Sequence, residues 1–291
     1  MEARADQYNR AQLEQRLRAY GETRPIENII AQYEYEREMA HRIRHATREE
    51  RLSLYGEVYD TLYKSFPDHP GLAKRNTAER MQQLRPLFER IRPLLTPDSL
   101  FLEIGAGDCL LAYQVAQVVK KVYALEVSAE KVAAPPPELD NFELVLFDGF
   151  HFPFPGATFD IAFSNQVLEH LHPEDALEHL QQVYRLLKPG GRYICIVPHR
   201  FTGPHDISRY FTEEATGLHL KEYTYHELAA MFHQVGFAKI RGLIRRRWVP
   251  VGYLTLLERL LEPFPYHLRK KLAHCSRVLR LVGLTGQKVQ R

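Results

Sequence analysis

The chain has 291 residues, of which 45% are hydrophobic and 26% charged, so it can bury a substantial core as one large domain or as a domain with an accessory element. Its formal net charge of +3 is too small to indicate extensive electrostatic binding of nucleic acid. Three widely separated cysteines (Cys109, Cys195 and Cys275) argue against a disulfide framework or a zinc motif. Because the first residues are polar and no run of about 18 apolar residues occurs, we expect a cytoplasmic protein without a membrane-spanning segment.

Residues 1–95 have the pattern of an extension made of amphipathic helices. The segment is rich in Glu, Arg, Gln, Leu and Ala and has no glycine-rich turns. Apolar residues recur at helical spacing, for instance Leu52, Tyr55, Tyr59 and Tyr63. We expect breaks near 21–25 and 67–71, where glycine and proline occur. Such an extension could cover a ligand site as a lid, although tyrosines on one helical face also suit ordinary packing.

Residues 98 to about 245 alternate short apolar strands with helical patterns, which is typical of a doubly wound α/β sheet. The predicted strands are 100–104, 122–127, 142–147, 159–164, 192–197 and 238–244. The predicted helices are 109–119, one that begins at Pro173, and 225–235. From 250 to 283 the leucines return to helical spacing.

Three acids, Glu103, Glu126 and Asp148, lie in or at the ends of three successive predicted strands. Gly105-Ala106-Gly107 separates the first strand from its helix, where glycines let the backbone approach a ligand and the helix start offers unpaired N–H groups. Glu126 follows Gly105 by 21 residues, the position at which dinucleotide-binding folds place a carboxylate against ribose hydroxyls. Ligands of such sheets bind at the carboxyl ends of the strands, so this pattern indicates a nucleotide-like cofactor.

Each of these residues also has a purely structural interpretation. Glu103 could cap a neighbouring backbone turn, and Asp148-Gly149 is a common turn pair. Pro189-Gly190-Gly191 ends a helix in any interpretation. Only the ordered set points to a cofactor.

Six segments follow one another in the order found in class I S-adenosylmethionine-dependent methyltransferases, and residues 95–245 resemble that family. The segments are Glu103-Ile104-Gly105-Ala106-Gly107-Asp108, Leu125-Glu126-Val127-Ser128, Phe147-Asp148-Gly149, 159–165, Val167-Leu168-Glu169-His170-Leu171 and Leu187-Lys188-Pro189-Gly190-Gly191. The resemblance implies an α/β fold with a Rossmann-like, doubly wound, seven-stranded sheet whose last strand is antiparallel. We place that strand near 285–290, so that the family domain covers 96–291 and the helices of 253–282 are an insertion before it.

The resemblance also implies roles for single residues toward the cofactor S-adenosylmethionine. Gly105 and Gly107 would pass under the methionine moiety, and Glu103 would interact with its ammonium group. Glu126 would accept hydrogen bonds from the ribose, and Asp148 would meet the adenine amino group. The remaining predicted contacts are Ala106 in the glycine turn, Val127 after Glu126, Phe147 or Gly149 beside the adenine ring, and Asn165 and Gln166 near the methionine end. Cys109 departs from the pattern, because many relatives have a third glycine there.

Nine of the fourteen histidines fall between residues 151 and 233, and their spacing does not suggest a metal ligand set, so we expect no metal. His170 follows the fourth strand, and His199 and His205 lie in the loop after the fifth. A neutral imidazole can take a proton from an acceptor, so these three are our candidates for a catalytic base, with Asp206 beside His205.

We therefore expect a methyltransferase that acts on a small-molecule acceptor, with O-methylation of a sugar, lipid or secondary metabolite favoured and no nucleic-acid partner. The alternatives are a non-catalytic cofactor-binding or membrane-associated protein and, less favoured, an NAD-dependent oxidoreductase, which would usually have a third glycine where Leu110 stands. A basic cluster before the leucine-rich helices could contact a phosphate-bearing or lipid-linked acceptor or an anionic membrane, or could be a solvated strand end; it consists of Arg241, Arg245, Arg246, Arg247 and Trp248. The oligomeric state stays open.

Overall fold

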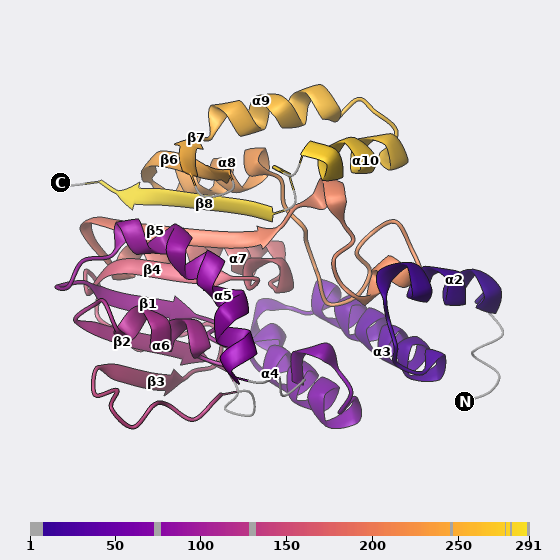
Figure 1. Cartoon of the computed structure of the whole chain (residues 1–291), viewed down its shortest axis with the longest axis horizontal. Helices are drawn as coiled ribbons and strands as arrows, with labels where there is room; N and C mark the ends of the chain where they lie inside the picture. The colour runs from indigo at the N-terminus through magenta and orange to yellow at the C-terminus, as the bar shows by residue number, and fades with distance from the viewer. Residues whose placement is uncertain are drawn as a thin grey trace.

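A mixed sheet with strand order β3-β2-β1-β4-β5-β8-β6-β7 forms the centre of the protein (Figure 1). The computed structural model describes residues 8–72, 77–127, 132–244, 247–276, 278–279 and 281–289. The strands are β1 (Leu100–Ile104), β2 (Lys121–Glu126), β3 (Phe142–Leu146), β4 (Phe159–Asn165), β5 (Leu187–Pro198), β6 (Phe237–Ile244), β7 (Arg247–Pro250) and β8 (Leu281–Lys288).

The strand directions confirm the expected Rossmann-like fold. β1 pairs in parallel with β2 and β4, β2 with β3, and β4 with β5. β8 is antiparallel to both β5 and β6 and is the predicted last strand, although it begins at Leu281 rather than near residue 285. The sheet has eight strands rather than the seven expected, because the short edge strand β7 pairs antiparallel with β6. Arg247 of the predicted basic cluster begins this strand, whereas Arg245 and Arg246 lie outside the described residues.

Helices cover both faces of the sheet, so two apolar layers form around it. On one face, α5 (Thr77–Ile91) and α6 (Leu110–Ala116) pack on buried strand residues such as Phe101 and Phe163. On the other, α7 (Pro173–Leu186) and α8 (Tyr225–Val235) contribute to the larger core around Tyr193. The central strands β1 and β4 are covered on both faces, which explains the largely apolar runs that they have in the sequence.

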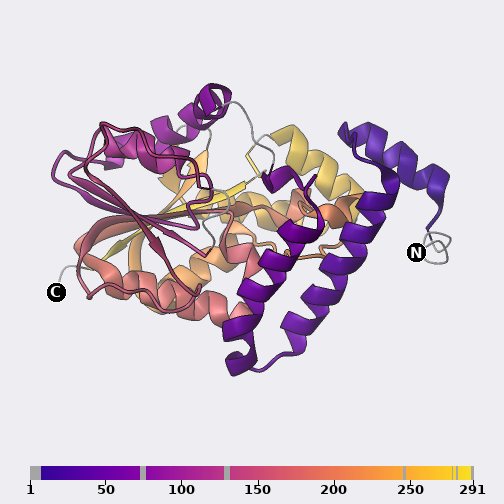
Figure 2. The same ribbon diagram turned by 90° about the horizontal axis from the view of Figure 1, so that it is seen from below.

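The N-terminal helices α2 (Arg10–Tyr20), α3 (Ile26–His45) and α4 (Arg48–Ser65) lie at the edge of the sheet toward which the parallel strands point (Figures 1 and 2). The break predicted near 21–25 is present, with Gly21 in the left-handed conformation that ends α2. A further break at residues 46–47 was not predicted, although Thr47 and Glu50 form a capping box there.

A buried ion pair fastens α4 to the sheet domain. Arg51, which is 2% exposed, donates from Nε to Oδ2 of Asp175 at 2.7 Å and from Nη2 to Oδ1 at 2.9 Å. The hydroxyl of Tyr55 also donates to Asp175, at 3.1 Å. Since Asp175 is in the first turn of α7, this pair fixes the position of α4 over the edge of the sheet.

The leucine-rich segment before β8 forms two helices, α9 (Gly252–Leu261) and α10 (Tyr266–Ser276), as the sequence predicted. The two helices and the connection between them expose several large apolar side chains, namely Tyr253, Leu256, Leu260, Phe264, Leu268 and Leu272. Within the described residues, neither these helices nor any other is long and apolar enough to cross a membrane.

Candidate active site

The glycine turn after β1 is tied to the next strand. The N–H groups of Gly105 and Ala106 both donate to the carbonyl of Leu125, at 2.9 and 3.1 Å. Gly105 has φ +67°, and a Cβ there would lie 2.5 Å from Cγ2 of Val167. Only glycine satisfies both conditions, so the turns after β1 and β4 are in direct contact.

Gly107 is different, because its surroundings are open. Its φ is +56°, and no atom lies within 4 Å of the place a Cβ would take. Its N–H donates to Oε2 of Glu126 at 2.7 Å, while Oε1 of Glu126 accepts from the N–H of Val127 at 2.8 Å. The carboxylate at the end of β2 is thus held against the glycine turn, and the side chain is 8% exposed.

Cys109 has a backbone conformation that favours glycine. It directly precedes α6, as its N-cap residue, with φ +58°, a left-handed conformation that strains most residues. The side chain is fully buried, and burial raises the pKa of the thiol, so the thiol is neutral and serves packing. The departure from the family pattern leaves the turn itself intact.

Glu103 has an unsatisfied buried oxygen beside this turn. The side chain is 5% exposed, and Oε2 has no hydrogen-bond partner within the described chain. Burial, followed by the charges of Asp108 and Glu126, raises the pKa of this carboxyl well above its usual value. An ammonium group would compensate such a carboxylate, so the residues present fit the amino-acid end of S-adenosylmethionine.

The turn after β3 contains Asp148, and an exposed apolar surface lies beside it. Oδ1 of Asp148 accepts from the N–H groups of Phe150 and His151, at 2.8 and 2.7 Å, so its carboxylate forms the turn that the structural interpretation anticipated. Val127 is 43% exposed and lies 3.7 Å from the place a Cβ on Gly149 would take, which gives these two residues a common surface. Phe147 packs instead on Phe152, with the ring centres 5.4 Å apart.

Asn165 ends β4, and Gln166 directly follows it with φ +58°. The N–H of Gln166 donates to the carbonyl of Ile196 at 2.8 Å, which holds this turn against β5. The predicted cofactor residues thus gather at the carboxyl ends of β1 to β4, the edge that α3 and α4 approach in Figure 1. A surface hollow lined by Leu95 and Val118 lies near the opposite edge, and we assign it no role.

The three candidate histidines differ in their surroundings. His199 is fully buried, its Nε2 lies 2.8 Å from Oε1 of Glu258, and its Nδ1 accepts from the N–H of Phe201. Because Glu258 also accepts from the N–H of Tyr225 at the start of α8, this geometry favours a structural role for His199.

His205 is neutral at pH 7, because burial lowers its pKa to about 4. Its Nε2 lies 3.2 Å from the carbonyl of His199 and 3.1 Å from Oγ1 of Thr202. Its backbone N–H donates to Glu222 at 2.7 Å. With so low a pKa the imidazole is a weak base, which favours a role in contacting an acceptor over one in removing its proton.

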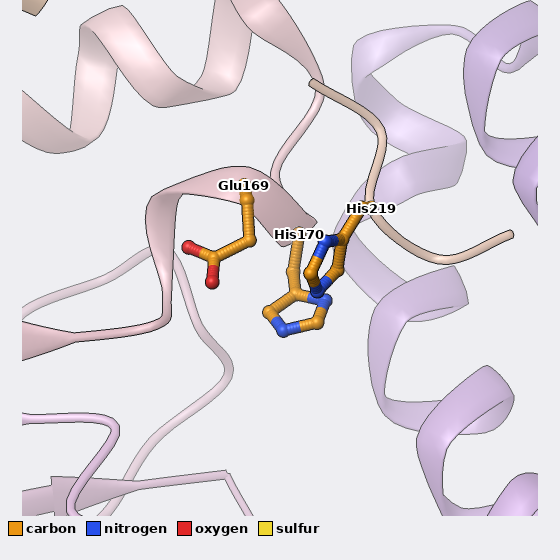
Figure 3. Close-up of side chains that lie close together, drawn as sticks. All are labelled: Glu169, His170 and His219. Carbon is orange, nitrogen blue, oxygen red and sulfur yellow. The ribbon is translucent and has the colours of Figure 1, made fainter. Parts of the chain in front are cut away.

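His170 belongs to a cluster that the sequence did not reveal (Figure 3). Glu169 and His170 end the short helix η4 (Leu168–His170) after β4, and His219 comes from a loop that faces it. Each of the three offers a potential metal ligand atom, and these atoms lie within 4.8 Å of one another. The expectation of no metal ligand set rested on sequence spacing, which cannot show that residues 170 and 219 meet through tertiary contact.

Comparison with known proteins gives a consistent picture. Residues 102–195 match the family model of a methyltransferase domain. A probable S-adenosylmethionine-dependent methyltransferase of Mycolicibacterium smegmatis is 24% identical over 181 residues, which are 59% of this chain and 68% of that protein. A protein of the same description from Mycobacterium tuberculosis is 25% identical over 53% of this chain and 54% of its own length. The chain thus spans between about half and two thirds of these relatives.

Among solved structures, a methyltransferase from Burkholderia thailandensis has a TM-score of 0.52 and 16% identity, and the match covers 84% of this chain and 92% of that one. That protein was solved with bound 1,6-didemethyltoxoflavin and S-adenosylhomocysteine. At this identity the likeness concerns the fold, and it extends beyond the segment that the family model matches.

Proposed function

We propose that the chain is an S-adenosylmethionine-dependent methyltransferase that acts on a small-molecule acceptor, with a hydroxyl of a sugar, lipid or secondary metabolite as the favoured target. The match of residues 102–195 to a methyltransferase domain and the likeness to probable S-adenosylmethionine-dependent methyltransferases support it. One observation carries the acceptor class: buried polar atoms without partners gather where the N-terminal helices meet the sheet domain. The N-terminal extension, residues 1–95, is in this proposal a cover over the acceptor, and residues 96–291 form the methyltransferase domain.

The buried polar atoms in question are two tyrosine hydroxyls and one carboxylate. The hydroxyls of Tyr59 and Tyr223 and both carboxylate oxygens of Glu169 have no hydrogen-bond partner in the described part of the chain. Burial raises the pKa of both tyrosines, and the nearby Glu169 adds to this effect. Buried polar groups are nearly always satisfied in folded proteins, so this set favours a small polar ligand enclosed between α4 and the sheet.

The chain's own residues would hold the cofactor at the strand ends. Glu103 would pair with the ammonium group, and Gly107 would let the backbone approach the methionine moiety. Glu126 would accept from the ribose, and Val127 with Gly149 would lie against the adenine. When bound, S-adenosylmethionine supplies an activated methyl group on a sulfonium, so the protein needs chiefly to align the acceptor and exclude water.

His170 and His205 are the proposed acceptor contacts. His170 is three residues after Val167, which touches the glycine turn, so it is close to the methionine end of the site. His205 lies in the loop after β5 and is joined through Glu222 to His219. In this proposal His199 has a structural role and holds the loop that carries His205 in place.

The test is release of S-adenosylhomocysteine in the presence of a panel of hydroxyl acceptors. Turnover with a sugar, lipid or secondary metabolite supports the proposal, and product analysis identifies the acceptor atom. Tight binding of S-adenosylmethionine with no turnover across the panel would support the non-catalytic alternative instead. Binding of NAD in place of S-adenosylmethionine would support the oxidoreductase.

Contact with an anionic lipid surface is a separate part of the proposal. The exposed side chains of α9, Tyr253, Leu256 and Leu260, recur at helical spacing, and the exposed cation Arg259 is on the same helix, while Lys271 is exposed on α10. Apolar side chains with neighbouring cations are what binding to an anionic membrane interface requires. Sedimentation with vesicles of anionic or neutral lipid tests it: the wild type should bind anionic vesicles, and L256S/L260S should not. Equal binding of both proteins would contradict it.

A further inference from the structure

Glu169, His170 and His219 form a cluster with the composition of a metal centre. Two imidazoles and one carboxylate are the donor set that divalent transition metals such as Zn²⁺, Mn²⁺ and Co²⁺ prefer. The ligand atoms lie within 4.8 Å of one another, so small side-chain rotations would bring them to a common ion. The rings of His170 and His219 are already in edge-to-face contact, with centres 4.8 Å apart.

The carboxylate of Glu169 is the observation that calls for a ligand. Glu169 is fully buried, and neither of its oxygens has a hydrogen-bond partner among the described residues. An isolated buried carboxylate is strongly unfavourable unless it is paired or coordinates a metal. No arginine or lysine among the described residues forms an ion pair with Glu169. The groups that remain to compensate its charge are His170, His219 and an ion that all three could bind.

Hydrogen bonds behind both imidazoles orient them as metal ligands. Nδ1 of His219 lies 2.9 Å from Oε1 of Glu222, and Nδ1 of His170 lies 3.0 Å from the carbonyl of Leu218. An imidazole that donates from Nδ1 to an oxygen carries its lone pair on Nε2, and such carboxylate or carbonyl partners are typical behind metal-bound histidines. Both rings are therefore in the tautomer that a metal requires.

The loop that carries His219 is held in place before any ligand arrives. Asp206 accepts through Oδ2 from the N–H groups of Gly217 and His219, at 3.1 and 3.3 Å. Nη2 of Arg44, on α3, lies 3.4 Å from the carbonyl of His219. Ligands fixed by their surroundings lose little conformational freedom on binding, so this scaffold favours tight coordination.

We propose that Glu169, His170 and His219 bind one divalent transition-metal ion, with Glu222 as the positioning residue behind His219. The role of the ion rests on the proposed function: three protein ligands leave coordination positions for an acceptor oxygen. A coordinated hydroxyl loses its proton to solvent more readily, which offsets the weak basicity of His205. The oxygen then bonds to the methyl carbon as the carbon–sulfur bond breaks, and the bonding electron pair goes to sulfur.

The experiment titrates Co²⁺ into the metal-stripped full chain and follows its visible absorption, with Zn²⁺ competition and metal analysis of the untreated protein. We expect one ion per chain. Glu169→Gln and His219→Gln should each weaken Co²⁺ binding by about 100-fold or more, and Glu222→Gln by about 10- to 100-fold. His233→Gln, which alters an exposed histidine of α8, should bind as the wild type does.

Two results would overturn the inference: no stoichiometric Co²⁺ binding by the folded wild type, or binding that all four variants share. The competing explanation is a proton held by the cluster in place of an ion, since burial raises the pKa of Glu169 to about 7. If the wild type binds S-adenosylhomocysteine but no metal, the metal site is refuted and the proposed function is not. Metal binding by a protein that does not bind S-adenosylhomocysteine would refute the proposed function and leave the metal site standing. The titration of the wild type tests the metal site without the variants, so the proposal can be refuted even if a variant fails to fold.

Discussion

Replacing Gly107 with alanine separates the cost of a strained backbone from the loss of a ligand surface. Gly107 has φ +56°, and the space where a Cβ would lie is open. The substitution therefore creates no clash within the protein, and its cost in folding is that of a left-handed alanine, about 1–2 kcal/mol. Alanine also lowers the conformational entropy of the unfolded chain, which offsets part of this cost. We therefore expect the free energy of unfolding to fall by about 1 kcal/mol and Tm by about 2–3 °C.

Cofactor affinity should fall far more than stability does. If the methionine moiety lies against Gly107, the new methyl group occupies its place, and we expect S-adenosylhomocysteine to bind about 10-fold more weakly or worse, which is about 1.4 kcal/mol or more. Isothermal titration measures the affinity, and a thermal melt measures the stability of the same sample.

Gly21→Ala is the matched control. Gly21 has φ +68°, likewise has nothing within 4 Å of its Cβ position, and ends α2 far along the chain from the glycine turn. It should lose the same stability and keep wild-type affinity for S-adenosylhomocysteine. Wild-type affinity in Gly107→Ala would refute the placement of the cofactor at this turn.

Three further predictions concern the ribose acid, the buried ion pair and acid stability. Glu126→Gln replaces an oxygen that accepts from Gly107 or Val127 by an amide donor, so S-adenosylhomocysteine should bind with about 1.5–3 kcal/mol less free energy; unchanged affinity in titration calorimetry would remove Glu126 from the site. Arg51→Leu leaves Asp175 buried with only partial compensation from Arg48, so urea unfolding should show a loss of about 3 kcal/mol, and Asp175→Asn in the same chain should restore part of it; a loss below about 1 kcal/mol would contradict the docking of α4. Burial lowers the pKa of His179 in the folded protein to about 4. As the pH falls, the imidazole of the unfolded chain is therefore protonated before that of the folded protein. The contribution of the neutral His179 to stability is complete above about pH 7 and is lost as the pH falls from about 6.5 to 4. Between pH 7.5 and pH 5 the wild type should therefore lose about 2 kcal/mol more unfolding free energy than His179→Gln, and parallel pH profiles of the two proteins would refute this.

The sheet could be predicted from the sequence because its strands are marked at both ends. Three short apolar runs end at or just before Gly105, Glu126 and Asp148, in that order along the chain, and this order specifies the edge of the sheet where the predicted cofactor residues gather. The sequence does not predict β7, because a strand of four residues that ends in Pro250 has no strand pattern of its own; β7 forms through its pairing with β6.

The histidines could not be sorted from sequence, since their roles depend on tertiary partners. His199 is buried through contact with Glu258, which is 59 residues away along the chain. His219 packs on His170, which is 49 residues away along the chain. The spacing of residues along the chain predicts neither contact. The glycine turn, in contrast, depends on its own backbone conformation, so the local sequence is enough to predict it.

The most direct test of the account is titration of the purified chain with S-adenosylmethionine and, separately, with NAD. The account predicts one S-adenosylmethionine site per chain, which competes with S-adenosylhomocysteine and weakens on Gly107→Ala, and no binding of NAD. Absence of S-adenosylmethionine binding at about 1 mM, an energy of association weaker than about 4 kcal/mol, would contradict it.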